Sequence, residues 1–378
     1  MKSIHLINFE TVHTSWCEIF PHRIANNLRL AQEILPANAD FCAVLKADAY
    51  GHGIDTVVPI VCQQKIKLIG ITSNAEARAV RNAGFKDTLI RLRSATPSEM
   101  KGALLDRVQE QVSTLHAAQV LHDLSRAEGY AEGVHLALNA DGMSRDGLEL
   151  LKHDGRQTCL DIIDLLGERI IGICSHFPSN IAKDLITSNR HFETDLEWIF
   201  TNSQLNRNQV KVHAGSSLTL VSGQPITTDF YRCGAILYGI LNPELGFEDT
   251  MQLKARITNL TTYPKGSTVG YDRATSLTQD RRLANISIGY ANGLKRNFFG
   301  RSSVLIRGQL VPVLGKISMN SLVADVTDLV DVEVEDEVVI FGQQGTESIG
   351  IDQIERQAET IMAEVYTDWG QRNERIYR

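Results

Sequence analysis

Between about residue 15 and residue 240, segments with helical spacing alternate with short apolar segments, and this alternation constrains the fold most. Phe20, Ile24 and Leu28 recur at helical intervals, and the apolar run 41–46 follows them. Further apolar runs come at 67–72, 88–93, 108–112, 134–139, 169–177 and 209–214. Strands that alternate with amphipathic helices pair in parallel through right-handed crossovers. Seven or eight such units in about 230 residues predict a (β/α)8 TIM-like barrel, with an open doubly wound sheet as the alternative.

The pattern changes after about residue 245. Short β-rich segments separated by Gly, Pro, Asn and Asp follow, and one late helix is predicted over 351–366. The 378 residues are also more than a single hydrophobic core usually supports. We therefore predict an α/β barrel over 12–242 and a C-terminal, mostly-β domain formed by 1–11 and 243–378.

The charge distribution argues against nucleic acid as a partner. The net charge is −7, and the 38 Lys and Arg residues are scattered along the chain without a basic cluster. No segment approaches the roughly 18 apolar residues that span a bilayer, and no export signal is visible at the N-terminus. The six cysteines lie far apart and form no metal-binding spacing. We expect a cytoplasmic protein with free thiols, no metal and no membrane partner.

Lys46 stands where catalytic groups collect in a barrel, directly after an apolar strand. Taken alone, such a lysine either extends to solvent or has a lowered pKa and forms Schiff bases. The segment 47–53 adds small residues, Tyr50 and His52. This composition predicts a tight turn that allows the backbone to approach a ligand.

The run AVLKADAYGHG (43–53) resembles the signature of the alanine racemase family, the pyridoxal 5'-phosphate enzymes of fold type III. The resemblance covers nearly the whole chain. It implies that Lys46 carries the cofactor covalently and that Tyr50 helps to hold the cofactor phosphate. It also implies a small-molecule amino acid as the substrate.

Four further runs in the barrel resemble motifs of this family. DGMSR (141–145) implies that Arg145 approaches the substrate carboxylate. The cofactor contacts implied by SHF (175–177), HAGSS (213–217) and YRCGAILYG (231–239) are His176, Ser217, Arg232, Gly234 and Ala235. Without the resemblance, Arg145 would read as a surface charge and His176 would equally fit a buried core histidine.

The arginine expected at the ring nitrogen has a chemical consequence. Guanidinium stays protonated, so Arg232 would leave the pyridine neutral and make it a weaker electron sink. A weaker sink favours removal and return of the α-proton over transamination or decarboxylation. Racemisation then needs one base on each face of the α-carbon. The resemblance implies Lys46 for one face and Tyr271, in TVGYDRATSL (268–277), for the other, where a cationic environment is expected.

Two more runs of the second domain resemble family motifs. ISIGYANG (286–293) implies Tyr290 as a phosphate or channel residue, with Arg296 nearby, and GKISMNS (315–321) implies Met319 as a substrate-binding residue. In the family, the tyrosine base and this methionine come from the second subunit. The resemblance thus implies a head-to-tail homodimer with shared active sites.

The sequence departs from the family where Arg145 should be braced. Many members carry a lysine, often carbamylated, shortly before the arginine loop, but LALNADGMSR (136–145) has none. Asn139 or Asp141, with a bound anion or water, is the expected replacement. The site loops resemble those of broad-specificity amino-acid racemases, which accept larger and basic side chains, and Asp146 is compatible with a basic substrate.

Those broad-specificity racemases are typically exported, and they join the cysteine of the lysine motif to a cysteine in the next strand. Cys42 matches the first cysteine, but KLIGIT (67–72) lacks the second. We therefore expect interconversion of L- and D-alanine, which supplies peptidoglycan precursors. A broad-specificity racemase acting on Lys, Arg or Ser is the alternative.

Two alternatives outside the racemases fit less well. Non-catalytic pyridoxal phosphate carriers use a similar barrel and lysine but lack the β-domain with its tyrosine, which Tyr271 matches here. Decarboxylases of basic amino acids need a catalytic cysteine near the last substrate loop, where this chain has Ser318. Both comparisons favour an isomerase.

Overall fold

The computed structural model describes residues 13–241, 243–298 and 300–378. The chain divides into two compact units. The barrel unit comprises Pro21–Thr250, and the β unit comprises residues 13–20 together with Met251–Arg378. These bounds differ from the predicted divisions at residues 12 and 242, and residues 1–11 of that prediction lie outside the described residues.

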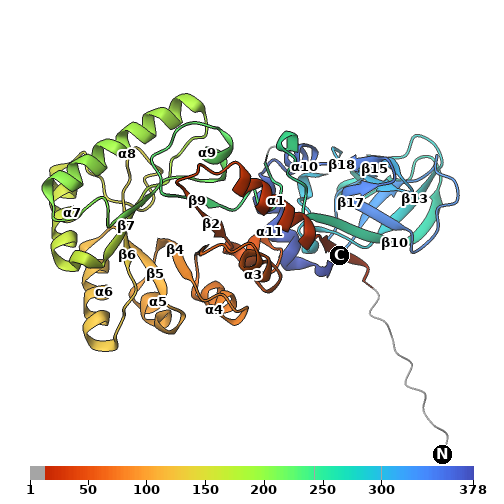
Figure 1. Cartoon of the computed structure of the whole chain (residues 1–378). Helices are drawn as coiled ribbons and strands as arrows, with labels where there is room; N and C mark the ends of the chain where they lie inside the picture. Colours follow the sequence, from red (N-terminus) through yellow and green to blue (C-terminus); the bar gives the residue numbers. More distant parts are fainter. Residues whose placement is uncertain (1–12, 242, 299) are drawn as a thin grey trace, which may run out of the picture. The chain divides into compact units, whose positions relative to one another are not determined.

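Eight parallel strands form the sheet of the barrel unit (Figure 1). In sheet order they are β8 (Lys211–His213), β7 (Ile170–Cys174), β6 (Val134–Ala137), β5 (Val108–Val112), β4 (Thr88–Ser94), β3 (Leu68–Ile71), β2 (Asp40–Val44) and β9 (Phe230–Cys233). The end strands β8 and β9 are linked where Arg232 N–H donates to Gly215 O at 3.0 Å. A further bridge joins Ser216 to Arg232, so the sheet is nearly closed. The predicted barrel is confirmed, and the open doubly wound alternative is wrong.

Helices connect these strands and cover the barrel. They are α1 (Pro21–Glu33), α3 (Ile54–Gln63), α4 (Asn74–Asn82), α5 (Pro97–Gly102), α6 (Leu115–Glu128), α7 (His153–Leu166), α8 (Ala182–Asn202) and α9 (Ser217–Val221). Helix α1 buries Ile24, Leu28 and Ala31, the face that the spacing predicts.

Two of these helices, α4 and α5, begin with a capping box that a glutamate closes. At α4 the Ser73 hydroxyl accepts the Glu76 N–H, and at α5 the Thr96 hydroxyl accepts the Glu99 N–H. In both cases the glutamate side chain accepts the N–H of the capping residue. Such reciprocal bonds satisfy backbone donors that a helix start otherwise leaves without partners.

The β unit contains a nine-stranded sheet. Its strands, in sheet order, are β18 (Glu347–Ile349), β17 (Glu337–Gln344), β14 (Ser303–Ile306), β15 (Gln309–Leu314), β16 (Leu322–Asp325), β13 (Arg281–Ile286), β10 (Met251–Tyr263), β1 (Ser15–Ile19) and β19 (Glu374–Tyr377). Strand β10 also pairs with β17, so the strands from β17 to β10 form a closed ring. The predicted mostly-β C-terminal domain is confirmed.

Two predicted details of the β unit need correction. Residues 15–19 lie within the predicted barrel range of 12–242. They instead form strand β1, which pairs antiparallel with β10, more than 200 positions later in the chain. The single helix predicted over 351–366 is two helices, α10 (Ile351–Ala358) and α11 (Met362–Arg372). Glu359 ends α10 in the left-handed conformation, with φ at 53°, and this separates the two helices.

The cysteines are free thiols. Cys42 is buried on β2, and a Cβ placed on Gly70 of the neighbouring strand would lie 3.5 Å from its sulfur. Neither Gly70 nor Leu68, the register partner of Cys42, has a side chain that could form a disulfide. Of the helices that the structure describes, none has both the length and the apolar character needed to cross a bilayer.

Candidate active site

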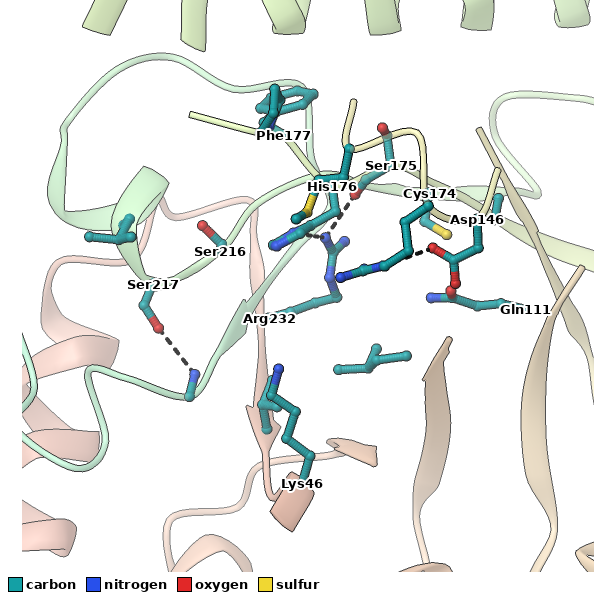
Figure 2. A pocket seen from close by; sticks show the side chains of 18 of the residues that line it. Lys46, Gln111, Asp146, Cys174, Ser175, His176, Phe177, Ser216, Ser217 and Arg232 are labelled. Atoms are coloured by element: carbon teal, nitrogen blue, oxygen red, sulfur yellow. Dashed lines mark hydrogen bonds and ion pairs between the residues drawn. The ribbon is translucent and has the colours of Figure 1, made fainter. Parts of the chain in front are cut away.

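A cavity of about 380 Å³ lies at the carboxyl ends of the barrel strands (Figure 2). It brings together side chains from loops far apart in the sequence, since Lys46 follows β2, His176 follows β7 and Ser217 follows β8. All the site residues predicted in the barrel line it: Lys46, Tyr50, Arg145, His176, Ser217, Arg232, Gly234 and Ala235. Carboxyl ends of barrel strands are the place where this fold carries catalytic groups.

The segment after Lys46 is one turn of left-handed helix. Ala47, Asp48, Ala49 and Tyr50 have φ between 52° and 55°, close to the ideal left-handed value. Each L-residue costs roughly 1–2 kcal/mol in this conformation relative to the right-handed helix. The turn, labelled α2 (Lys46–Tyr50), places Lys46 and Tyr50 together, with Nζ of Lys46 5.9 Å from the centre of the Tyr50 ring. One strained turn thus presents both residues to the cavity.

The environment of Lys46 favours the neutral amine. Its side chain is exposed to the cavity, yet the surrounding protein lowers the pKa of Lys46 by desolvation, and the positive charges of Arg145 and Arg232 lower it further. Figure 2 shows Lys46 extending toward Arg232. A neutral amine is the form that attacks a carbonyl or accepts a proton.

One end of the cavity combines backbone N–H groups with two hydroxyls. Ser217 Oγ accepts the N–H of Gly234 at 3.0 Å, as Figure 2 shows, and its hydroxyl, which also contacts the Cys233 thiol, is a donor that a ligand can use. A Cβ on Gly234 would lie 2.4 Å from the Tyr50 hydroxyl, so glycine is needed for this approach. Burial raises the pKa of Tyr50 to about 12, so the hydroxyl remains a hydrogen-bond donor.

Arg232 is buried and held by backbone and histidine acceptors. Its Nη1 donates to His213 O at 2.5 Å and to His213 Nδ1 at 2.8 Å. Its Nη2 donates to Ser175 O at 2.8 Å. Among the described residues Nε has no hydrogen-bond partner, and the side chain lines the cavity. Arg232 can therefore offer one N–H to a ligand without releasing any protein contact.

The histidines behind Arg232 have defined tautomers. Arginine only donates, so Nδ1 of His213 accepts and its proton is on Nε2. That Nε2 donates to Nδ1 of His135 at 2.9 Å, and Nε2 of His135 then donates to Oε1 of Gln109 at 2.9 Å. A Cβ on Gly172 would lie 1.9 Å from His135 Nδ1, so this glycine makes room for the ring. Both histidines are neutral in this arrangement.

The buried, neutral His135 predicts that the stability of the protein depends on pH. Burial, with a smaller effect of Arg232, lowers the pKa of His135 to about 4, whereas an unfolded histidine titrates near 6.5. Below pH 6.5 the unfolded state binds a proton that the folded state refuses, so stability falls as the pH falls toward 4. We expect His135→Asn to reduce the pH slope of the unfolding free energy by up to about 1.4 kcal/mol per pH unit, measured by urea unfolding between pH 7 and pH 5. His153→Asn, at an exposed position, is the control for loss of a histidine. A slope of His135→Asn equal to that of the wild-type protein would contradict the prediction.

His176 borders the same cavity. Its ring is exposed to the cavity, but desolvation and then the positive charges of Arg232, Arg145 and Lys46 lower the pKa of His176 to about 3. Its Nδ1 lies 3.4 Å from Nη2 of Arg232. A neutral imidazole can stack on a planar ring without adding charge to it.

Asp146 braces Arg145, which corrects the expectation that Asn139 or Asp141 does so. Oδ1 of Asp146 accepts from Nε of Arg145 at 3.2 Å, and Oδ2 accepts the N–H of Ser94 at 3.2 Å. Asn139 instead bonds Ser144 and Glu149, and Asp141 pairs with His191. Asn139 and Asp141 thus contact other residues, while the Ser94 N–H at the end of β4 anchors Asp146.

The residues predicted in the β unit lie on adjoining loops of that unit. Tyr290 N–H donates to Ser318 O at 3.1 Å, which joins the Tyr290 loop to the Met319 loop. A Cβ on Gly270, before Tyr271, would lie 2.5 Å from the backbone nitrogen of Lys316. Arg296 lies 6.0 Å from the Tyr290 ring. The three side chains are exposed in this single chain: Tyr271 by 62%, Met319 by 54% and Tyr290 by 38%.

Comparisons with known proteins identify the family. The family model described as alanine racemase, N-terminal domain, matches residues 19–242, and the one described as alanine racemase, C-terminal domain, matches residues 250–377. The chain belongs to the alanine racemase family. Members of the alanine racemase family are pyridoxal phosphate-dependent isomerases, so the resemblance found in the sequence is confirmed.

The curated relatives in the alanine racemase family carry different substrate names. A broad specificity amino-acid racemase of Pseudomonas taetrolens is 38% identical over 365 residues, covering 96% of this chain and 89% of the relative. A lysine racemase of Proteus mirabilis is 37% identical over 365 residues, covering 97% and 90%. An alanine racemase of Methylacidiphilum infernorum is 30% identical over 368 residues, covering 96% and 92%. The chain is an amino-acid racemase of the alanine racemase family.

Solved structures of alanine racemases share the fold. The enzyme from Streptomyces lavendulae superposes with a TM-score of 0.89 at 24% identity, covering 98% of each chain. The enzyme from Bartonella henselae, solved with covalently bound pyridoxal phosphate, gives a TM-score of 0.84 at 23% identity and covers 97% of this chain and 100% of that one.

Sequence reasoning missed several residues that shape this site. His213 and His135 were visible only as members of strand-like runs, and nothing local indicates that the rings meet. Asp146 stood next to Arg145 but was considered only in relation to a basic substrate. Glu76 had a local signal, because the Ser73 to Glu76 spacing is that of a capping box.

Proposed function

We propose that this chain is a pyridoxal phosphate-dependent amino-acid racemase with a broad substrate range. The observation that carries the cofactor chemistry is a single cavity that holds Lys46, whose pKa is lowered, together with a buried Arg232 that has one N–H available. The names of the relatives support the substrate range. A lysine amine and an arginine beneath the same cavity suit a cofactor that has an aldehyde and a ring nitrogen.

The donor set of the cavity fits pyridoxal phosphate. Ser217 and Tyr50 offer hydroxyl protons around the Gly234 backbone, which suits a phosphate group. Arg232 Nε suits the ring nitrogen, and the neutral His176 ring suits a stacked aromatic face. When bound, the cofactor supplies an electron sink that acidifies the α-proton of the amino acid.

The proposed residues divide the proton transfer between two faces. Lys46 holds the cofactor at rest and moves the α-proton at Nζ on one face of the substrate. The hydroxyl of Tyr271 of the partner subunit moves the proton on the other face. Arg145, held by Asp146, binds the substrate carboxylate together with Met319, and Tyr290 lies toward the phosphate or the entry channel. Arg232 stays protonated and limits the sink to reversible proton removal.

A head-to-tail homodimer is part of the proposal. Support comes from the exposure of Tyr271 and Met319, which are catalytic and substrate-binding candidates without a cover in their own unit. Mixing the inactive variants Lys46→Ala and Tyr271→Ala is expected to restore about a quarter of the wild-type activity after subunit exchange, because half the dimers are hybrids with one intact site. Absence of any restored activity after verified exchange would contradict shared sites.

The substrate range is tested with a panel of the twenty L-amino acids, assayed for D-product. Relatives at 37–38% identity are named for broad specificity or for lysine, which supports turnover of lysine and arginine as well as alanine and serine. Alanine alone is the second candidate, supported by the 30% identical alanine racemase. Product from alanine only would decide for the second candidate, and no product from any amino acid would reject the racemase proposal.

Gly234→Ala is expected to weaken cofactor affinity at least about tenfold, because the new methyl group would displace the Tyr50 hydroxyl from the proposed phosphate site. Titration of the cofactor-free protein with pyridoxal phosphate, followed by absorbance, measures the effect. Gly350→Ala is a matched control, since no atom lies within 4 Å of its added Cβ. Equal affinities in the two variants would argue against a phosphate site at Gly234.

A further inference from the structure

Glu76 connects the start of α4 to the turn that carries Lys46. Its Oε1 accepts the N–H of Ala47 at 2.7 Å, and its Oε2 accepts the N–H of Thr72 at 2.7 Å and of Ser73 at 3.1 Å. The Glu76 carboxylate therefore does more than cap its own helix. It joins the end of β3 to the residue directly after Lys46.

The Ala47 N–H, at the start of the left-handed turn, has its acceptor outside the turn. Within the turn Ala49 N–H donates to Leu45 O at 2.9 Å, and Gly51 N–H donates to Ala47 O at 3.0 Å. For Ala47 the residue four positions earlier belongs to β2, so its acceptor comes from another element. A run of non-glycine residues at positive φ persists where surrounding structure fixes it. Glu76 supplies such a contact at the first residue of the run.

Charge gives a second link between Glu76 and Lys46. The charged groups that act on the amine are Arg145 and Arg232, which lower the pKa of Lys46, and Glu76, which raises it. His176 faces the same space and is neutral. Glu76 thus offsets part of the effect of the two arginines.

We propose that Glu76 is a positioning residue for Lys46: its carboxylate fixes the left-handed turn at Ala47 and supplies the negative charge that balances the cationic cavity. This inference rests on the proposed role of Lys46 as the cofactor-binding lysine and base. Glu76 itself does not line the cavity, so it acts through the turn.

The chain offers a matched control for Glu76→Gln. Glu99 closes the same kind of capping box at the start of α5, the helix after the next strand, and it does not contact the Lys46 turn. Glu99→Gln therefore reproduces the loss of a capping carboxylate. Ser73→Ala removes the other half of the α4 box but leaves the bond from Glu76 to Ala47 in place. Together, the three variants distinguish the contact between Glu76 and Ala47 from the role of Glu76 in capping α4.

The first readout is hydrogen exchange of the cofactor-free protein. Glu76→Gln is expected to accelerate exchange of the amides at 47–53 about tenfold or more. Glutamine has one acceptor oxygen for the three N–H donors that the two carboxylate oxygens satisfy, so the turn is held less firmly and opens more often. Glu99→Gln and Ser73→Ala are expected to leave this segment unchanged. Equal acceleration in Ser73→Ala, or no acceleration in Glu76→Gln, would overturn the proposal.

The second readout is the pH profile of kcat, which reports groups in the enzyme–substrate complex, where the Lys46 amine no longer holds the cofactor. Removal of the negative charge lowers the pKa of Lys46, so the acidic limb is expected to move down by about half a pH unit in Glu76→Gln and to stay in place in Glu99→Gln. Borohydride reduction of the loaded Glu76→Gln protein should still label Lys46. Label on another lysine would reject the proposed function itself, whereas label on Lys46 with an unmoved limb would reject the role of Glu76.

Discussion

Replacement of Lys46 by alanine is expected to lower kcat for racemisation by at least about 10⁴-fold while leaving the fold intact. The side chain projects into the cavity instead of the core, so its removal exposes no apolar surface and breaks no strand. Among the described residues that line the cavity, no lysine other than Lys46 could supply an amine in its place. The variant loses both the covalent attachment point and one proposed base.

Borohydride reduction followed by peptide mapping checks the same assignment directly. The wild-type protein, loaded with pyridoxal phosphate, should carry the reduced cofactor on Lys46 and absorb near 420 nm before reduction, about the usual position for this linkage. Lys101→Ala is the control, because Lys101 is an exposed residue paired with Glu128. A label that persists in the Lys46 variant would show that another lysine holds the cofactor.

Replacement of Tyr271 by phenylalanine is expected to act on one enantiomer more than on the other. With one proposed base missing, exchange of the α-proton with deuterium oxide should slow by about 10²–10⁴-fold for the enantiomer that loses its base. Lys46 should still exchange the α-proton of the opposite enantiomer. Mass spectrometry of each recovered enantiomer measures both rates separately.

Tyr263→Phe is the matched control for Tyr271→Phe. Tyr263 is also an exposed tyrosine of the β unit, at the end of β10, and it has no proposed role. Its replacement should leave both exchange rates unchanged. A small and equal effect of Tyr271→Phe on both enantiomers would remove Tyr271 as a base.

The barrel could be predicted because its determinants are local. Apolar runs such as 108–112 form a strand with the predicted bounds, and α1 buries the face that its spacing indicates. Strand β1 could not be assigned to its sheet in this way. Its sequence is typical of a strand in either unit. Its partner β10 lies more than 200 residues later, so no local pattern indicates the pairing. The break between α10 and α11 depends on one left-handed residue, Glu359, which carries no glycine signal.

The sequence could predict which residues belong to the candidate site. It could not predict most of the contacts and backbone conformations that hold them there. The cavity groups the predicted barrel residues, because the loops that carry them all follow parallel strands. The brace of Arg145 depends on Ser94 in another strand, so the local run could not distinguish Asp146 from Asn139 or Asp141. The left-handed turn was also beyond sequence reasoning, since Ala47 and Ala49 are residues that strongly favour right-handed helices.

The left-handed turn also bears on the order in which the protein assembles. An isolated segment 46–50 would relax to right-handed or extended conformations, because L-alanine gains nothing from positive φ. Because Glu76 supports the turn from α4, we expect the turn to become stable after β3 and α4 have formed. We therefore expect that a nascent or partly folded chain does not yet present Lys46 in its reactive orientation. In pulse-labelling experiments during refolding, protection of the amides at 47–53 should follow that of β2 and β3, so the cofactor would be captured by chains whose first strands have already joined.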